Sequence, residues 1–110
     1  MLATITYIKL KSYFAFFPLS MYAMRILKQM KSSGHLDFKK SGVGVHHYTM
    51  SLWPDTETMH SFARSGAHLE AMRNSKKIAT EIRTITITAD TLPDWTTARQ
   101  HLQNGKVIKF

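Results

Sequence analysis

The chain has 110 residues, no cysteine and a formal net charge of +8. This length fits one domain with an ordinary core, and the hydrophobic fraction of 44% is that of a globular protein. The lack of cysteine excludes disulfides, thiolate zinc sites and cysteine nucleophiles, and it is consistent with a cytoplasmic location.

The positive charge is spread along the chain instead of forming one block. The densest groups are Arg25, Lys28 and Lys31, then Lys39 and Lys40, then Arg73, Lys76 and Lys77. This spread is typical of solvated helix faces and argues against a nucleic-acid partner. No segment reaches the roughly 18 apolar residues of a membrane span, but YFAFFPLSMYAM (13–24) leaves a membrane-surface role open.

The first third of the chain predicts a strand and then a helix. Residues 2–11 alternate apolar and polar side chains with period two, which indicates a strand. An apolar loop at 13–17 follows, and Pro18 suits the first turn of a helix that is expected to end near Lys31. The expected inward face of this helix is Leu19, Tyr22, Ala23, Ile26, Leu27 and Met30.

The middle of the chain predicts a strand that leads into a broken helix. Residues 35–41 fit a short strand or a connection, and 42–53 fit a clear strand, with the break between them left open. The Pro-Asp pair at 54–55 ends the strand and caps the next helix. That helix is expected to break near 65–66 and to resume over 67–80.

The last third predicts a strand at 81–89, a short helix at 94–103 and an extended apolar tail. The whole order is βαββαβ with a split second helix, which is an α+β, ferredoxin-like arrangement. We divide the chain into a ferredoxin-like domain, 1–90, and a C-terminal helical or extended appendage, 91–110.

The strand at 42–53 carries bulky side chains on both of its faces. A sheet with helices on one side should be polar on the other side. The spare face is therefore expected to pack against a second copy of the chain, which gives a homodimer.

The segment LWPDTETMHSFARSGAHLEAM (52–72), in this strand order, resembles the dimeric α+β barrel superfamily. It is most similar to small antibiotic-biosynthesis-monooxygenase-type and spheroidene-monooxygenase-like proteins. The matching positions are Ser51, Trp53, Asp55, Phe62 and His68. The resemblance covers roughly 2–90, and it implies two four-stranded sheets that pair into a barrel. It also implies a pocket in each subunit between sheet and helices.

The resemblance and the residues together point to a catalytic pair. A His at a helix start tends to be neutral, so His68 is expected to act as a base or orienting donor. Its alternative role is to pack locally and bond the turn before it. Arg83 is expected to stabilise developing negative charge, or else to pair with an acid. The expected substrate-binding residues are Trp53, Tyr22, His47, Tyr48 and Met72, each with core packing as its alternative.

The other histidines give no metal site. His46 and His47 are adjacent on a strand, so they point to opposite faces, and which of them faces the pocket is left open. No spacing typical of a metal site occurs, so no metal is predicted.

The sequence favours a monooxygenase-like protein that oxidises or binds a small apolar or aromatic molecule without a cofactor. One alternative is a non-catalytic ligand-binding or structural homodimer. The other is a haem-binding protein that uses His68. In haem-degrading relatives the ligand His lies further along the second helix, near the position of Met72 here, which argues against haem degradation.

Overall fold

The computed structural model describes all of residues 1–110. The elements in chain order are β1 (Leu2–Leu10), the 3₁₀ turn η1 (Tyr13–Ala15), α1 (Phe16–Met30), β2 (Asp37–Val43), β3 (His46–Trp53), α2 (Thr56–Ala63), α3 (Gly66–Ile78), β4 (Ala79–Thr88), α4 (Trp95–Leu102) and β5 (Lys106–Lys109). This order confirms the α+β, ferredoxin-like class. None of the helices combines the length and the apolar character that crossing a membrane requires.

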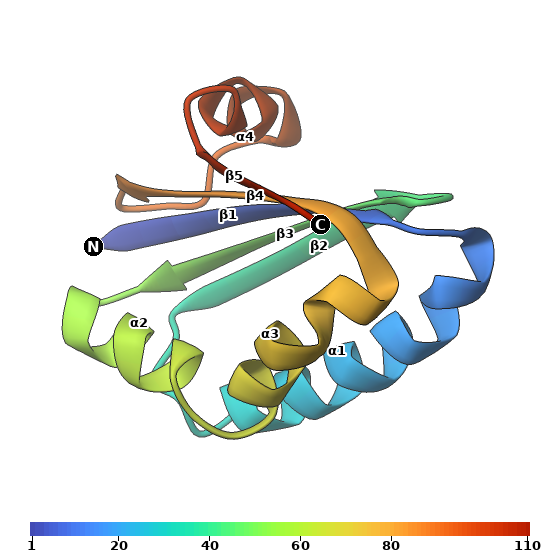
Figure 1. The fold of residues 1–110 in the computed structure, drawn as a ribbon. Helices are drawn as coiled ribbons and strands as arrows, with labels where there is room; N and C mark the ends of the chain where they lie inside the picture. Colours follow the sequence, from blue (N-terminus) through green and yellow to red (C-terminus); the bar gives the residue numbers. More distant parts are fainter.

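The five strands form one antiparallel sheet in the order β2-β3-β1-β4-β5. Strand β1 lies at its centre, where Ile5 stands opposite Met50 of β3 and Ile85 of β4. Helices α1, α2 and α3 cover one face of the sheet, and α4 lies alone on the other face (Figure 1). We call these the three-helix face and the α4 face.

The alternation of β1 distributes its side chains between the two faces. Ile5 and Tyr7 join a core cluster with Ala98 and Leu102 of α4, so they point to the α4 face. Thr4 and its neighbours at even positions point the other way. On the three-helix face the buried side chains form two separate clusters, one around Trp53 and one around Ile82. Half-exposed threonines lie between these clusters.

The break between α2 and α3 is held by a side chain of α1. Gln29 Nε2 donates to the Ser65 carbonyl (2.9 Å), and Gln29 Oε1 accepts from the backbone N–H of His68 (2.9 Å). Gly66 has φ +58°, and a Cβ there would stand 3.1 Å from Gln29. The amide of Gln29 thus satisfies the free backbone groups of both helix ends.

Two expectations need refinement, and a third is confirmed. The strand expected at 42–53 is divided, because Gly44 turns the chain with φ +61° and leaves β2 and β3 as a hairpin. The second half of the broken helix ends at Ile78, since Ala79 already pairs with Leu10. The Asp55 cap is confirmed, because its Oδ1 accepts from the N–H of Thr58 (2.7 Å).

The larger correction concerns the spare face of the sheet. We expected it to be open for a second subunit, but α4 packs on part of it and buries Ala98 and Leu102 almost fully. Strand β5 also extends the sheet, pairing Val107 with Arg83. The segment after residue 90 therefore packs as part of the same sheet and core.

The burial of α4 predicts a stability effect. Leu102→Ala should lower the free energy of unfolding by about 2–5 kcal/mol, as for other buried leucines. Urea denaturation measures this loss. Val107→Ala is the control, because Val107 is 41% exposed and should change stability much less. Equal small effects of both changes would mean that α4 does not contribute to the core.

Candidate functional site

An open cavity of about 250 Å³ lies on the α4 face of the sheet. Its walls come from β1, β3, β4 and α4, so residues far apart in sequence meet there. The lining residues are Tyr7, Tyr48, Glu81, Arg83, Arg99, Leu102 and Gln103. We call this space the α4 cavity.

Aromatic rings form a continuous row along one side of the α4 cavity. The ring of Tyr7 lies 5.9 Å from that of His46, in a stacked arrangement, and 5.0 Å from that of Tyr48. Tyr48 in turn meets Trp95 of α4 edge-on at 6.3 Å. Of these rings, Tyr7 and Tyr48 line the cavity, and each offers an apolar ring surface to a ligand.

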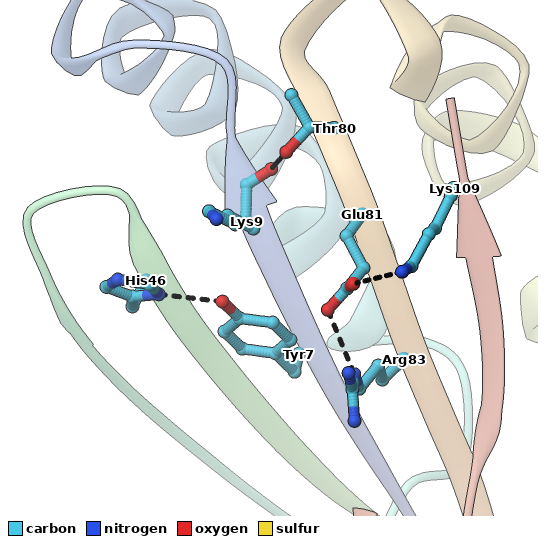
Figure 2. A network of polar contacts seen from close by, with 7 residues as sticks. All are labelled: Tyr7, Lys9, His46, Thr80, Glu81, Arg83 and Lys109. Carbon is cyan, nitrogen blue, oxygen red and sulfur yellow. Dashed lines mark hydrogen bonds and ion pairs between the residues drawn. The ribbon is translucent and has the colours of Figure 1, made fainter.

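Two guanidinium groups line the α4 cavity beside these rings. Arg99 of α4 lies over the ring of Tyr48, with its Cζ 5.3 Å from the ring centre. Arg83 Nε donates to Glu81 Oε2 (2.9 Å), and Lys109 Nζ stands 4.0 Å from the other carboxylate oxygen (Figure 2). The hydrogen bond from Arg83 is the main reason that the pKa of Glu81 lies below its usual value.

A tyrosine and a histidine form a hydrogen-bonded pair beside these charges. The hydroxyl of Tyr7 lies 2.7 Å from Nδ1 of His46 (Figure 2). Burial, followed by the nearby Tyr48 and Glu81, raises the pKa of the Tyr7 hydroxyl, and Arg83 offsets part of that effect. Tyr7 therefore stays protonated at neutral pH, so its hydroxyl can donate the hydrogen bond that it shares with Nδ1 of His46.

The predicted catalytic pair is not brought together. Arg83 lines the α4 cavity, whereas His68 lies at the start of α3 in the three-helix layer, on the opposite side of the sheet. The Nδ1 atom of His68 lies 3.1 Å from the carbonyl oxygen of Ala63, and the ring packs 5.1 Å from that of Phe62. Local packing thus accounts for the contacts of His68.

Of the five expected substrate-binding residues, only Tyr48 lines the α4 cavity. Trp53 is 1% exposed, donates from Nε1 to Ser51 Oγ (2.8 Å) and cannot reach a ligand. Tyr22 packs against the cluster around Ile82. The other two also lie away from the cavity lining, His47 beside Phe16 and Met72 on the outer surface of α3.

The sequence left open which of the two adjacent histidines faces a pocket, and in the structure they point to opposite faces of the sheet. His46 is the one on the cavity side, where it meets Tyr7. Sequence reasoning also missed Arg99, because nothing local places a helix of the last twenty residues above β3.

A second cavity of about 250 Å³ lies at the end of α1, beside the α2–α3 break. It is lined by Gln29, Phe62 and four serines. The side-chain amide of Gln29 already forms hydrogen bonds with the backbone of Ser65 and His68 there. No three His, Cys, Asp or Glu side chains gather anywhere in the structure in a way that fits a metal ion.

The burial of His68 predicts a pH effect on stability. Burial lowers the pKa of His68, and the hydrogen bond to Ala63 offsets part of this shift. Below about pH 6.5 the unfolded chain takes up a proton that the folded chain excludes, so stability falls as the pH falls. His68→Gln should therefore lose less stability than the wild type between about pH 7.5 and about pH 5.5, measured by urea denaturation.

The matched control is His60→Gln, because His60 is exposed on α2. This variant should keep the pH dependence of the wild type. If His68→Gln also keeps it, the buried imidazole is not its source.

The fold is shared with several solved structures. A candidate antibiotic biosynthesis monooxygenase from Deinococcus radiodurans superposes with a TM-score of 0.71 at 13% identity, covering 86% of this chain and 97% of the other. A protein from Mycobacterium tuberculosis gives 0.71 at 10% identity, with 84% and 98% covered. SnoaB, a cofactor-independent oxygenase from Streptomyces nogalater, gives 0.66 at 12% identity, with 84% and 97% covered.

These identities establish a common fold and no common reaction. No curated protein matches the sequence significantly. The match to a family gives more than a common fold. The sequence pattern of the monooxygenase af470-like family fits residues 4–92. That span runs from within β1 to just after β4 and is most of the chain, and the protein therefore belongs to the monooxygenase af470-like family.

Proposed function

We propose that the protein binds a small aromatic molecule with an acidic phenol or enol in the α4 cavity and oxidises it with molecular oxygen. One observation carries this proposal: two guanidinium groups and two tyrosines line one cavity, and the hydroxyl of one of them, Tyr7, is hydrogen-bonded to His46. The volume of about 250 Å³ is near the lower end of ligand sites, which favours one or two rings.

The charges of the lining favour an anionic ligand. Arg83 and Arg99 contribute two positive charges, and Glu81 is the one acid of the lining. Its carboxylate is already bonded by Arg83. Guanidinium groups form strong charge-assisted hydrogen bonds with anionic oxygen, so a phenolate or enolate would be held more tightly than the neutral molecule.

The Tyr7–His46 pair provides a path for the proton that the ligand must lose. The oxygen of Tyr7 takes the proton of the ligand while its own proton moves to Nδ1 of His46. His46 is exposed, so water solvates the imidazolium that results and carries the proton away. The raised pKa of Tyr7 keeps it from ionising on its own and leaves the transfer dependent on His46.

The oxidation balances without an added reductant. The neutral ligand loses two hydrogens in all, the first of them as the proton that Tyr7 takes. It gives electrons to O₂ and gains one oxygen atom, and the second oxygen leaves as water with those two hydrogens. The description of SnoaB as a cofactor-independent oxygenase supports this course by analogy of fold. The absence of cysteine from the sequence supports a reducing compartment, and we assign the protein to the cytoplasm.

We further infer a homodimer in which a second copy meets the part of the α4 face that α4 leaves open. The 83% exposed Val43 lies at that part of the sheet, and His46 opposite it would stay at the rim of the contact, where water still reaches the imidazole. Light scattering should give twice the chain mass of 12.6 kDa. A mass of one chain at micromolar concentration would contradict this assembly.

Dihydroxynaphthalene is a suitable probe, because it is planar, fluorescent, acidic and of two rings. Fluorescence titration measures its dissociation constant, and an oxygen electrode measures turnover. Arg83→Gln and Arg99→Gln should each weaken binding by about tenfold or more, since each removes a charge-assisted hydrogen bond. Tyr7→Phe should keep binding within a few-fold and abolish most oxygen uptake.

The control is Arg73→Gln, because Arg73 is exposed on α3, on the other side of the sheet. It should match the wild type in both measurements. Binding without oxygen uptake in the wild type would support the ligand-binding alternative in place of the enzyme. Binding that is insensitive to Arg83 and Arg99 would refute the cavity as the site.

A further inference from the structure

The outer side of α1 and the turn before it carry large apolar side chains that nothing in the chain covers. The exposed fractions are 74% for Tyr13, 81% for Phe14, 68% for Phe17, 58% for Met21 and 72% for Met24. We call these five residues the outer apolar patch. Monomeric soluble proteins rarely expose so many large apolar side chains together, so the patch points to a binding surface.

The patch is continuous because of the helix period. Phe17, Met21 and Met24 follow i, i+4, i+7 spacing and therefore form one line along α1. The inward side chains Leu19, Tyr22, Ala23, Ile26, Leu27 and Met30 lie on the opposite side of the helix and are half-buried or buried. Helix α1 is thus apolar on two opposite sides, and only one of them belongs to the core.

The turn η1 extends the patch at one end of the molecule. The ring of Tyr13 lies against the β2–β3 turn, where a Cβ on Gly44 would come within 3.2 Å of it. The turns η1 and β2–β3 therefore lie against each other beside the start of α1, at the same end of the sheet (Figure 1).

The charges around the patch are of one sign. Residues 1–36 contain five Lys and Arg side chains and no Asp or Glu. Lys28 and Lys31 continue the line of the patch, and Lys11 precedes η1; all three are exposed and form no ion pair. Arg25 of α1 stands 3.8 Å from Glu70, and this is the one ion pair that α1 forms.

From this combination we propose that the outer apolar patch docks on an anionic lipid surface. Helix α1 would lie flat on the bilayer, with its apolar line in the boundary of the acyl chains and its lysines among acidic headgroups. A second copy of the chain fits less well, because a symmetric contact would bring the same unpaired lysines of both copies together. This surface is separate from the α4 cavity, so the two proposals fail or hold independently.

Vesicle sedimentation tests the proposal with the whole protein. The wild type should sediment with vesicles of phosphatidylcholine mixed with phosphatidylserine, and it should stay in solution with phosphatidylcholine alone. Raising the salt concentration should release it, because screening weakens the attraction of lysines to acidic lipid. Equal binding to both vesicles, or to neither, would overturn the proposal.

Two double variants separate the apolar contribution from the charged one. Phe17→Ser with Met24→Ser, and Lys28→Gln with Lys31→Gln, should each lower the partition coefficient by about tenfold or more. All four side chains are exposed, so melting temperatures should stay near that of the wild type.

The matched controls lie on α3. Met72→Ser replaces another exposed methionine, and Lys76→Gln with Lys77→Gln removes two exposed lysines outside the patch. These controls should sediment like the wild type. A loss as large as in the patch variants would overturn the assignment to α1. A dimer in light scattering that Phe17→Ser with Met24→Ser dissociates, without vesicle binding, would assign the patch to a second copy.

Discussion

The pairing of β1 with both β3 and β4 is the constraint on which the other features depend. The register sets Tyr7 opposite Tyr48 on one side and opposite Arg83 on the other. Because side chains alternate along a strand, these three residues must share a face. A slip of β1 by one residue would turn Tyr7 toward the three-helix layer and separate it from Tyr48 and Arg83.

The same alternation explains why the two faces of the sheet differ in character. The three-helix face has apolar clusters at its two ends and half-exposed threonines between them, so its centre makes few dry contacts. The α4 face has a dry cluster under α4 and a polar, charged region beyond it. The helix α4 is only eight residues long, and its short length is what leaves the charged region open.

Charge has a different role in each part of the molecule. In the α4 cavity the cations stand beside an acid and two aromatic rings, so their positions are fixed by contacts. On α1 the lysines are exposed to solvent beside apolar side chains. They can attract negative charge, but no contact fixes their positions. The first arrangement suits the recognition of one small anion. The second suits binding to a surface that carries many negative charges.

The elements and their amphipathic sides followed from the sequence, because they depend on residues within one or two helical turns. The period of residues 2–11, the inward line of α1, the Asp55 cap and the break near Gly66 are all of this kind. The same local reasoning could not show which candidate side chains lie together. It paired His68 with Arg83, which lie on opposite sides of the sheet, and it left open which of His46 and His47 faces a pocket.

Those choices depended on contacts between residues far apart in the chain. Tyr7 meets His46 across 39 positions, and Gln29 reaches the backbone of His68 across another 39. Arg99 comes to Tyr48 only because α4 folds back over the sheet. The sequence by itself determined which segments are strands and helices and which sides of them are apolar. Only the tertiary structure decided which face carries the cavity, since packing of α4 against β1 and β3 is encoded in shape complementarity and not in any local pattern.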